Sequence, residues 1–329
     1  MSDETKAPQP LPRKARRRRV LRWGATVAVI AIVGYFFARS LISNWGEIEA
    51  RQLSFSWMWV LATVLFAVAV PLTGIAWARI VRTLDPAARV SSAEAVAVQC
   101  LSWLLKYIPG QVGSVANKVV WAKKKGISRT LIVISFIYEN VFLQLASIVP
   151  AVVILFISLG PQIFGENVTL LVLPLIILIP LVLVLYRPFF HMIVRVPAKR
   201  VLKKEISREY FLGSGPSLVS LLEFIGPRIV NGVGFVLIAA AVAEVAPDEW
   251  LPFAAAYVLA GAIGILAVFV PSGLGVREAV IVLILSQYIP TAEAIIISLL
   301  ARLLSTIGDA IIAVIYLGIR RTVPKELRP

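Results

Sequence analysis

The residues of this sequence that could do chemistry are a few charged side chains inside long apolar stretches. Placing a charge at the centre of a lipid bilayer costs roughly 2.5–3.5 kcal/mol on insertion scales, so each one is a functional candidate. A structural ion pair is the alternative for each of them, for example Arg277 with Glu278 or Glu223. The candidates are Glu139, Glu223, Arg228, Arg277, Glu278, Arg302 and Asp309.

The sequence around Arg277 predicts an anion-binding site. Gly275 begins a short helix that carries Arg277 and Glu278, and the first turn of a helix presents free backbone N–H groups to anions. A guanidinium group can donate two parallel hydrogen bonds to phosphate oxygens. We therefore expect a lipid phosphate to bind here, with Arg302 as a second donor.

Two further groups of polar residues bear on this site. Arg302 and Asp309 are seven residues apart, which is two turns along one helix face, so they could flank a common cavity. Pairing of Arg302 with Asp309 or Glu139 is the structural alternative. Asn117 and Lys118 could form a matching polar end in the first half of the chain, but for Lys118, as for Lys106, we favour snorkelling to the membrane surface.

Composition places these charges in a membrane protein. Hydrophobic residues make up 59% of the 329 positions and charged residues 16%, whereas soluble domains carry roughly 45–50% and about 25%. The net charge of +15 could indicate nucleic acid, but the basic runs border apolar segments, as in loops that face anionic lipids. We expect anionic or phosphate-bearing membrane lipids as partners, and no nucleic acid.

Little in the sequence supports enzymatic chemistry. The single cysteine, Cys100, excludes an internal disulfide and a thiolate metal cage, and His191 lies in a basic loop rather than among carboxylates. An acid/base cluster and an Asp-x-Asp motif are both absent from the sequence. We therefore predict no catalytic residue, no metal and no cofactor, with a membrane-embedded lipid-linked transferase as the alternative.

Apolar segments of about 20 residues are long enough to cross a bilayer as helices. We predict six such spans, over residues 20–40, 57–80, 130–158, 168–187, 216–245 and 293–318. Two more apolar stretches, 92–122 and 251–289, are interrupted by Pro109-Gly110-Gln111-Val112-Gly113 and by Pro271-Ser272-Gly273-Leu274-Gly275. Proline removes a backbone donor and glycine permits turns, and such breaks survive at membrane depth only beside protein or a wet cavity. The fold class is therefore an all-α integral membrane protein with two re-entrant helix hairpins.

The basic residues test this topology, because Lys and Arg concentrate in cytoplasmic loops. Of the 33, 27 lie in residues 1–22, 79–89, 118–129, 187–211 and 320–329, all on one predicted side. We predict a disordered basic tail over 1–19, a transmembrane domain over 20–320 and a tail over 321–329, both tails being cytoplasmic, in the inner or plasma membrane. Counting a broken stretch as two short spans keeps the same parity, so the distribution of basic residues does not exclude eight helices.

The two broken stretches form an inverted repeat. Pro109 and Gly113 have the spacing of Pro271 and Gly275, and a charged residue follows each proline, Glu139 after 30 positions and Arg302 after 31. By the charge distribution, the first stretch begins at the cytoplasmic side and the second at the outside. Inverted repeats with discontinuous helices are typical of transporters that bind substrate near the membrane midplane. The alternative is that the breaks merely kink two packed helices.

These motifs resemble the flippase-like transmembrane domain of the lysylphosphatidylglycerol synthase family over residues 20–320. The resemblance rests on Pro271-Ser272-Gly273-Leu274-Gly275-Val276-Arg277-Glu278-Ala279 with Ala301-Arg302-Leu303-Leu304, and on Tyr107-Ile108-Pro109-Gly110-Gln111-Val112-Gly113 with Tyr138-Glu139. Ser272 and Asn140 stand where the family often has a second glycine and an arginine. Aminoacyl-transferring members also carry a large soluble catalytic domain, so the resemblance implies the lipid-moving part alone.

We accordingly expect a flippase or transporter that moves an anionic lipid between leaflets, such as a phospholipid or a polyprenyl-phosphate-linked sugar. A structural accessory subunit of a lipid-modifying complex is a third interpretation, and oligomerisation is left open. The predicted substrate-binding residues are Arg277, Glu278, Arg302, Asp309, Glu139, Gly273, Gly275, Pro271, Pro109, Gly110, Gly113 and Asn117.

Overall fold

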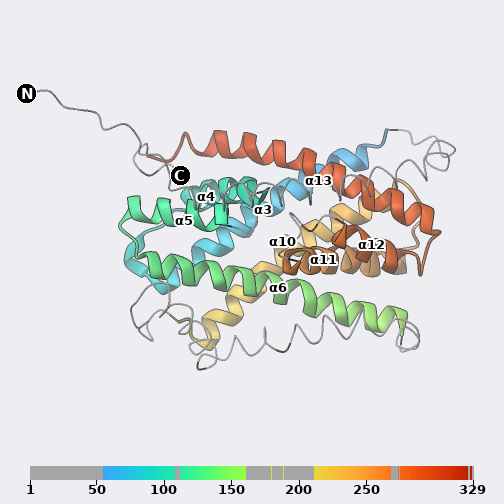
Figure 1. Ribbon diagram of the computed structural model, residues 1–329, viewed down its shortest axis with the longest axis horizontal. Helices are drawn as coiled ribbons and strands as arrows, with labels where there is room; N and C mark the ends of the chain where they lie inside the picture. The colour runs from blue at the N-terminus through green and yellow to red at the C-terminus, as the bar shows by residue number, and fades with distance from the viewer. Residues whose placement is uncertain are drawn as a thin grey trace, which may run out of the picture. The chain divides into compact units, whose positions relative to one another are not determined.

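The computed structural model describes residues 55–107, 112–160, 211–267, 273 and 275–324, with the isolated residues 179, 188 and 327. The helices among them belong to one compact unit, Gly46–Pro329 (Figure 1). Every regular element in these ranges is a helix, which confirms the predicted all-α fold. The predicted tail over 1–19 and the predicted spans over 20–40 and 168–187 lie outside the described residues.

Long apolar helices dominate the described part of the chain. Four of them coincide with predicted spans, namely α3 (Trp57–Leu84), α6 (Arg129–Leu159), α10 (Ser214–Ala240) and α13 (Thr291–Ile319). A fifth candidate span, Pro247–Leu266, consists of the short helix η5 (Pro247–Glu249) and α11 (Trp250–Leu266). We predicted this segment as the first arm of a re-entrant hairpin, but its 20 residues suffice by length and composition to cross a membrane.

Local sequence signals set the ends of several helices. Ser56 caps α3, since its side chain accepts a hydrogen bond from the backbone N–H of Met58 at 3.2 Å. Ser91 and Glu94 form a reciprocal capping box at the start of α4 (Ser92–Leu104). α6 ends at Leu159, and the next residue, Gly160, has a φ of 67°, a value that favours glycine.

Both predicted breaks interrupt the helices. In the first stretch, α4 and the short helix η2 (Leu105–Tyr107) are followed by α5 (Val112–Lys125). In the second, α11 ends at Leu266, and α12 (Val276–Leu285) begins after the break. The lengths differ, because α4, α5 and α12 have 13, 14 and 10 residues and α11 has 17. The two arms of the first hairpin are therefore the more evenly matched.

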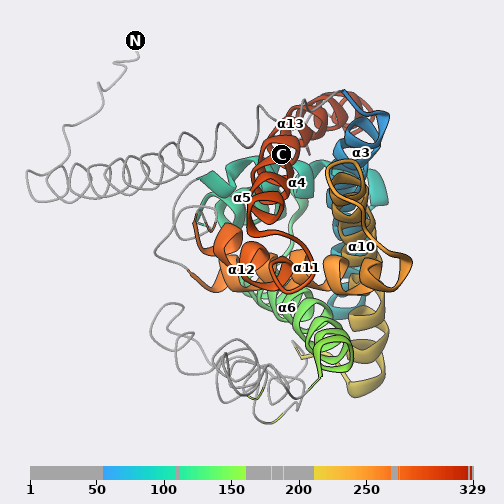
Figure 2. The same cartoon turned by 90° about the vertical axis from the view of Figure 1, so that its right-hand side faces the viewer.

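The two helix pairs lie at opposite ends of this unit. Figure 1 shows α4 and α5 together toward the end where α3 finishes and α6 begins, and α11 and α12 toward the end where α13 begins. The view in Figure 2 shows α13 and α6 on opposite sides of these pairs. The inverted repeat likewise requires the two pairs to lie at opposite ends of the unit. Their re-entry into the membrane from opposite faces stays a prediction.

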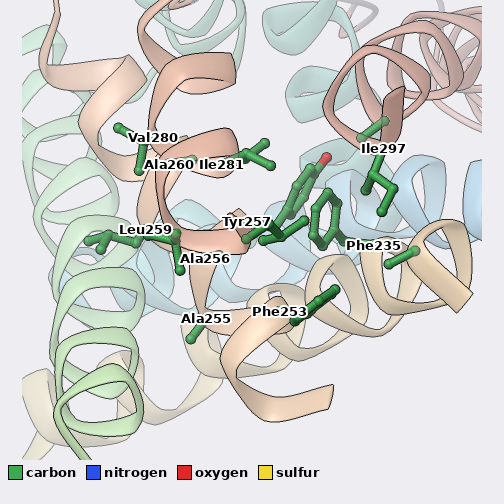
Figure 3. Packing of buried hydrophobic residues seen from close by; sticks show 14 of the residues in the cluster. Phe235, Phe253, Ala255, Ala256, Tyr257, Leu259, Ala260, Val280, Ile281 and Ile297 are labelled. Carbon is green, nitrogen blue, oxygen red and sulfur yellow. The ribbon is translucent and has the colours of Figure 1, made fainter. Parts of the chain in front are cut away.

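An aromatic stack forms the core beneath the second hairpin. The ring of Tyr257 on α11 lies between Phe66 of α3 and Phe235 of α10, with ring centroids 5.1 and 4.7 Å away. Figure 3 shows Tyr257 and Phe235 together, near Phe253 and Ile297 of the same core. The helices approach closely here, since a Cβ added at Gly234 would lie 3.0 Å from the Phe66 ring. This packing fixes Tyr257 between the apolar core and the charged residues described next.

Candidate functional site

Charged residues from both hairpins gather beside the middles of two long helices. Arg302 and Asp309 lie in the central part of α13, and Arg228 lies at the middle of α10. Lys106 belongs to η2, just before the first break, and Arg277 to the first turn of α12, just after the second. The middle of a spanning helix corresponds to the centre of the bilayer. We call this set the hairpin-tip cluster; it comprises Lys106, Arg228, Arg277, Glu278, Arg302 and Asp309.

Asp309 ties the first hairpin to α13. Its Oδ1 accepts hydrogen bonds from Lys106 Nζ at 2.9 Å and from the Trp103 indole N–H at 2.8 Å. Its Oδ2 lies 2.9 Å from the same ammonium group. Lys106 also lies 4.3 Å from the centroid of the Trp103 ring, within cation–π distance. Asp309 therefore neutralises Lys106 at close range and is an anchor for the hairpin.

Glu278 occupies the helix end at which we predicted a phosphate. One carboxylate oxygen accepts a hydrogen bond from the backbone N–H of Gly275 at 2.7 Å. The other lies 3.9 Å from the guanidinium of Arg302, beyond hydrogen-bonding distance. Both side chains are partly exposed, Arg302 by 15% and Glu278 by 13%. The predicted anion site thus holds a carboxylate of the protein itself, loosely matched to its arginine.

Arg277 and Arg228 interact electrostatically and share Tyr257 as a neighbour. The Arg277 guanidinium lies 4.3 Å from the centroid of the Tyr257 ring. Arg228 lies within electrostatic range of both Arg277 and Tyr257, and its Nε is buried without a hydrogen-bond partner among the described residues. Arg277 forms no ion pair with any carboxylate that the structure describes. The pairing with Glu223 that we considered is not found.

Glu223 and Glu139 belong to other parts of the molecule. Glu223 pairs with Arg79 of α3 at 2.5 Å. Glu139 forms an ion pair with Lys118 and accepts a hydrogen bond from Gln99 Nε2 at 2.8 Å. Contrary to our expectation, the hydrogen bond and the ion pair that Glu139 forms within the described residues connect it to the first hairpin and to no member of the hairpin-tip cluster.

The Lys118–Glu139 ion pair is enclosed by the protein, and we call it the sealed pair. Lys118 is 0% exposed and Glu139 3%. The ammonium lies 4.2 Å from the ring centroid of Trp77 and 5.5 Å from that of Phe136. The prediction that Lys118 snorkels to the surface is wrong, because a carboxylate and two aromatic faces inside the protein take the place of water.

The remaining predicted residues shape the hairpins. The Asn117 side-chain amide donates to the backbone carbonyl of Val98 at 3.1 Å and to the hydroxyl of Ser102 at 3.0 Å, which holds α5 to α4. Gly273 has a φ of 65°, and a Cβ added there would lie 2.7 Å from the Cα of Gly264. The structure also places Gly113, which is buried, and Gly275, whose φ is 82°, whereas Pro109, Gly110 and Pro271 lie outside the described residues.

Sequence reasoning missed three contributors to this site. Lys106 was interpreted as an interfacial lysine, and Trp103 and Tyr257 carry no signal that separates them from other aromatic residues in apolar helices. The position of Lys106 three residues before Pro109 was the available signal, because a charge beside a helix break can reach the membrane interior. Among the described residues, no group of His, Cys, Asp or Glu could hold a metal ion.

A hollow of about 550 Å³ lies elsewhere, between the C-terminal end of α10 and the start of α13. Its lining includes Glu244, Tyr288 and Glu293, and none of the hairpin-tip cluster. Burial raises the pKa of Tyr288, in the turn before α13, to about 12, with the nearby Glu249 carboxylate acting in the same direction. This hollow is acidic, so it does not provide the cationic surroundings that a phosphate needs.

Comparison with known proteins adds one match. The family model described as the lysylphosphatidylglycerol synthase TM region matches residues 23–313. The match covers all the helices described above except the last residues of α13. Searches of curated proteins and of solved structures gave no match.

Proposed function

This chain belongs to the family of the lysylphosphatidylglycerol synthase transmembrane region, and we propose that it moves an anionic, phosphate-bearing lipid between the leaflets of the membrane. The observation that supports this most is the hairpin-tip cluster. It brings cationic groups from two oppositely directed hairpins to the middle of long membrane helices, and it leaves them partly exposed. A phosphate that crosses hydrocarbon needs such donors in place of water.

A phosphate could bind at this cluster by replacing the carboxylate of Glu278. Arg302 and Glu278 are 3.9 Å apart, so little hydrogen-bond energy is lost when Glu278 gives up this contact. An incoming phosphate would take the place of Glu278 beside Arg302 and would accept hydrogen bonds from Arg277. The lipid tails would stay in the bilayer while the headgroup passes the hairpin tips.

The orientation in the membrane is part of the proposal. Basic residues lie at the ends of α3, α5 and α13 that Figure 1 shows at one end of the unit, for example Arg82, Lys123 and Arg320. Acidic residues, such as Asp248 and Glu249, lie in the connection between α10 and α11 at the opposite end. By the positive-inside rule the basic end faces the cytoplasm. The family description refers to a transmembrane region, which supports a carrier rather than an enzyme.

A leaflet-specific assay tests the function. Purified protein is reconstituted into vesicles that contain fluorescent phosphatidylglycerol, and a membrane-impermeant quencher reports the label in the outer leaflet. We expect the protein to accelerate exchange between leaflets, and we expect Arg302→Ala and Arg277→Ala to slow it by at least about tenfold, since each removes charge-assisted hydrogen bonds to phosphate.

The matched control is Arg79→Ala, which removes an arginine whose partner is Glu223 and which lies outside the cluster. This variant should exchange lipid at the wild-type rate. Thermal unfolding in detergent is measured on all variants. Normal exchange by stable Arg302→Ala and Arg277→Ala proteins would refute the site, and loss of exchange in step with stability would show that the arginines have only a structural role.

A further inference from the structure

Arg228 is one of two members of the hairpin-tip cluster that have no carboxylate partner among the described residues, and it also has a buried donor without a hydrogen-bond partner. Its Nε is buried and has no hydrogen-bond partner among the described residues. Among the charged side chains, Arg277 exerts the strongest electrostatic effect on it, and Arg277 is also positive. Two guanidinium groups repel each other at short range, and a buried donor without a partner destabilises the protein. Such an arrangement is expected where an anion binds between the two groups for part of the time.

The charges of the whole cluster show how much negative charge is missing. Within the part of the chain that the structure describes, Lys106, Arg228, Arg277 and Arg302 are cationic, and Glu278 and Asp309 are anionic. Asp309 contacts Lys106 with both oxygens at 2.9 Å, and Glu278 faces Arg302 at 3.9 Å. Arg228 and Arg277 remain, so the cluster has two positive charges in excess.

We propose that the preferred substrate carries two negative charges on its headgroup, as a lipid phosphomonoester or diphosphate does, and that Arg228 and Arg277 bind the second charge. This inference rests on the proposed function and narrows its substrate class. A phosphodiester headgroup with a single negative charge would lack the second charge that these two arginines bind, and at membrane depth an uncompensated charge is costly. The Arg277 guanidinium lies against the Tyr257 ring, and both groups interact electrostatically with Arg228.

Two fluorescent lipids with identical tails test the inference in the vesicle assay at pH 8. Phosphatidic acid carries a phosphomonoester, which loses most of its second proton at this pH, because the second pKa of phosphomonoesters in water is about 6. Phosphatidylglycerol carries one charge. We expect the protein to exchange phosphatidic acid at least about tenfold faster than phosphatidylglycerol, after subtraction of the rates in protein-free vesicles.

Arg228→Gln removes one charge and should reduce this preference to less than about twofold, mainly by slowing phosphatidic acid. Arg79→Gln is the matched control and should keep the preference. Arg228→Lys keeps the charge and should retain most of it, which covers the case in which Arg228→Gln fails to fold.

Each outcome separates the two proposals. Equal exchange of both lipids by the wild type would overturn the dianionic preference and leave the proposed function standing. Exchange of neither lipid would refute the proposed function, and the inference with it. A tenfold preference that survives in a folded Arg228→Gln protein would overturn the role of Arg228.

Discussion

The sealed pair and the hairpin-tip cluster occupy corresponding places in the repeat but have opposite surroundings. Glu139 lies ten residues after the start of α6, and Arg302 lies eleven residues after the start of α13. Glu139 is enclosed with Lys118, Gln99 and aromatic rings, whereas Arg302 is 15% exposed and faces Glu278 at 3.9 Å. Residues at corresponding positions of the repeat can therefore have different partners and different exposure to solvent.

The difference has a physical cause. A buried ion pair is stable only if its partners are close and their remaining hydrogen-bonding groups are satisfied. Lys118 and Glu139 come close to meeting that condition within the first half of the chain, so they can hold structure and have little left with which to bind a ligand. In the hairpin-tip cluster positive charge exceeds negative charge among the described residues, so a bound anion would stabilise it.

The largest effect on folding stability is expected when one partner of the sealed pair is removed. Lys118→Ala leaves the carboxylate of Glu139 buried without its cation, which should cost about 3–5 kcal/mol of folding stability. Denaturant unfolding in detergent micelles measures the loss. The double variant Lys118→Met with Glu139→Leu should recover most of it, because it removes both charges and keeps the volume. A loss below about 1 kcal/mol in Lys118→Ala would break the comparison.

A second prediction concerns how each hairpin is held together. Gly273→Ala should destabilise the protein by about 2–4 kcal/mol, because φ is 65° and the new Cβ would lie 2.7 Å from Gly264. Gly264→Ala is the control on the other side of the same contact. Its Cβ would find ordinary contacts of 3.5 Å, so the change should stay below about 1 kcal/mol in the same unfolding measurement.

The first hairpin depends on a polar side chain instead of a glycine contact. Asn117→Ala removes the two hydrogen bonds to Val98 and Ser102, and should cost about 1–2 kcal/mol. Unfolding in detergent measures this change beside Gly273→Ala. If Asn117→Ala costs more than Gly273→Ala, the glycine contact is less important to the second hairpin than the structure indicates.

The smallest effect on folding stability is expected at the hairpin-tip cluster. Arg302→Ala should change the free energy of unfolding by about 1 kcal/mol or less, because its contact with Glu278 is long and partly exposed. Measured together with the exchange assay, this variant should lose transport and keep its stability. A destabilisation as large as that of Lys118→Ala would mean that both regions are structural ion pairs.

Hydropathy and break motifs predicted much of the fold. The four unbroken spans at 57–80, 130–158, 216–245 and 293–318 have their counterparts in α3, α6, α10 and α13, because a run of about 20 apolar residues has few alternatives in a membrane. The breaks near Pro109 and Pro271 could also be predicted from the sequence, since proline and glycine act on the local backbone. The sequence analysis did not foresee that Pro247–Leu266 is long and apolar enough to cross a membrane, because the break near Pro271 was taken as the tip of a re-entrant hairpin.

Partners of the charged residues could not be predicted in the same way. Glu139 was grouped with Arg302 and Asp309 because all three stand in matching helices, but its contacts are to Gln99 and Lys118. Lys106 was interpreted as interfacial, yet it reaches Asp309 across 203 residues of sequence. Contacts of this kind depend on helix rotation and on the depth of each hairpin, and neither property is encoded in a local pattern.

The sequence by itself determined that this is a helical membrane protein of the lysylphosphatidylglycerol synthase transmembrane family, with two inverted breaks and buried charges. Those properties follow from composition, local backbone chemistry and motif order, which act over short distances along the chain. Only the tertiary structure decided which charges neutralise each other and which remain available. Electrostatic energy depends on separation and burial in space, so residues with the same place in a repeat, such as Glu139 and Arg302, can have different roles.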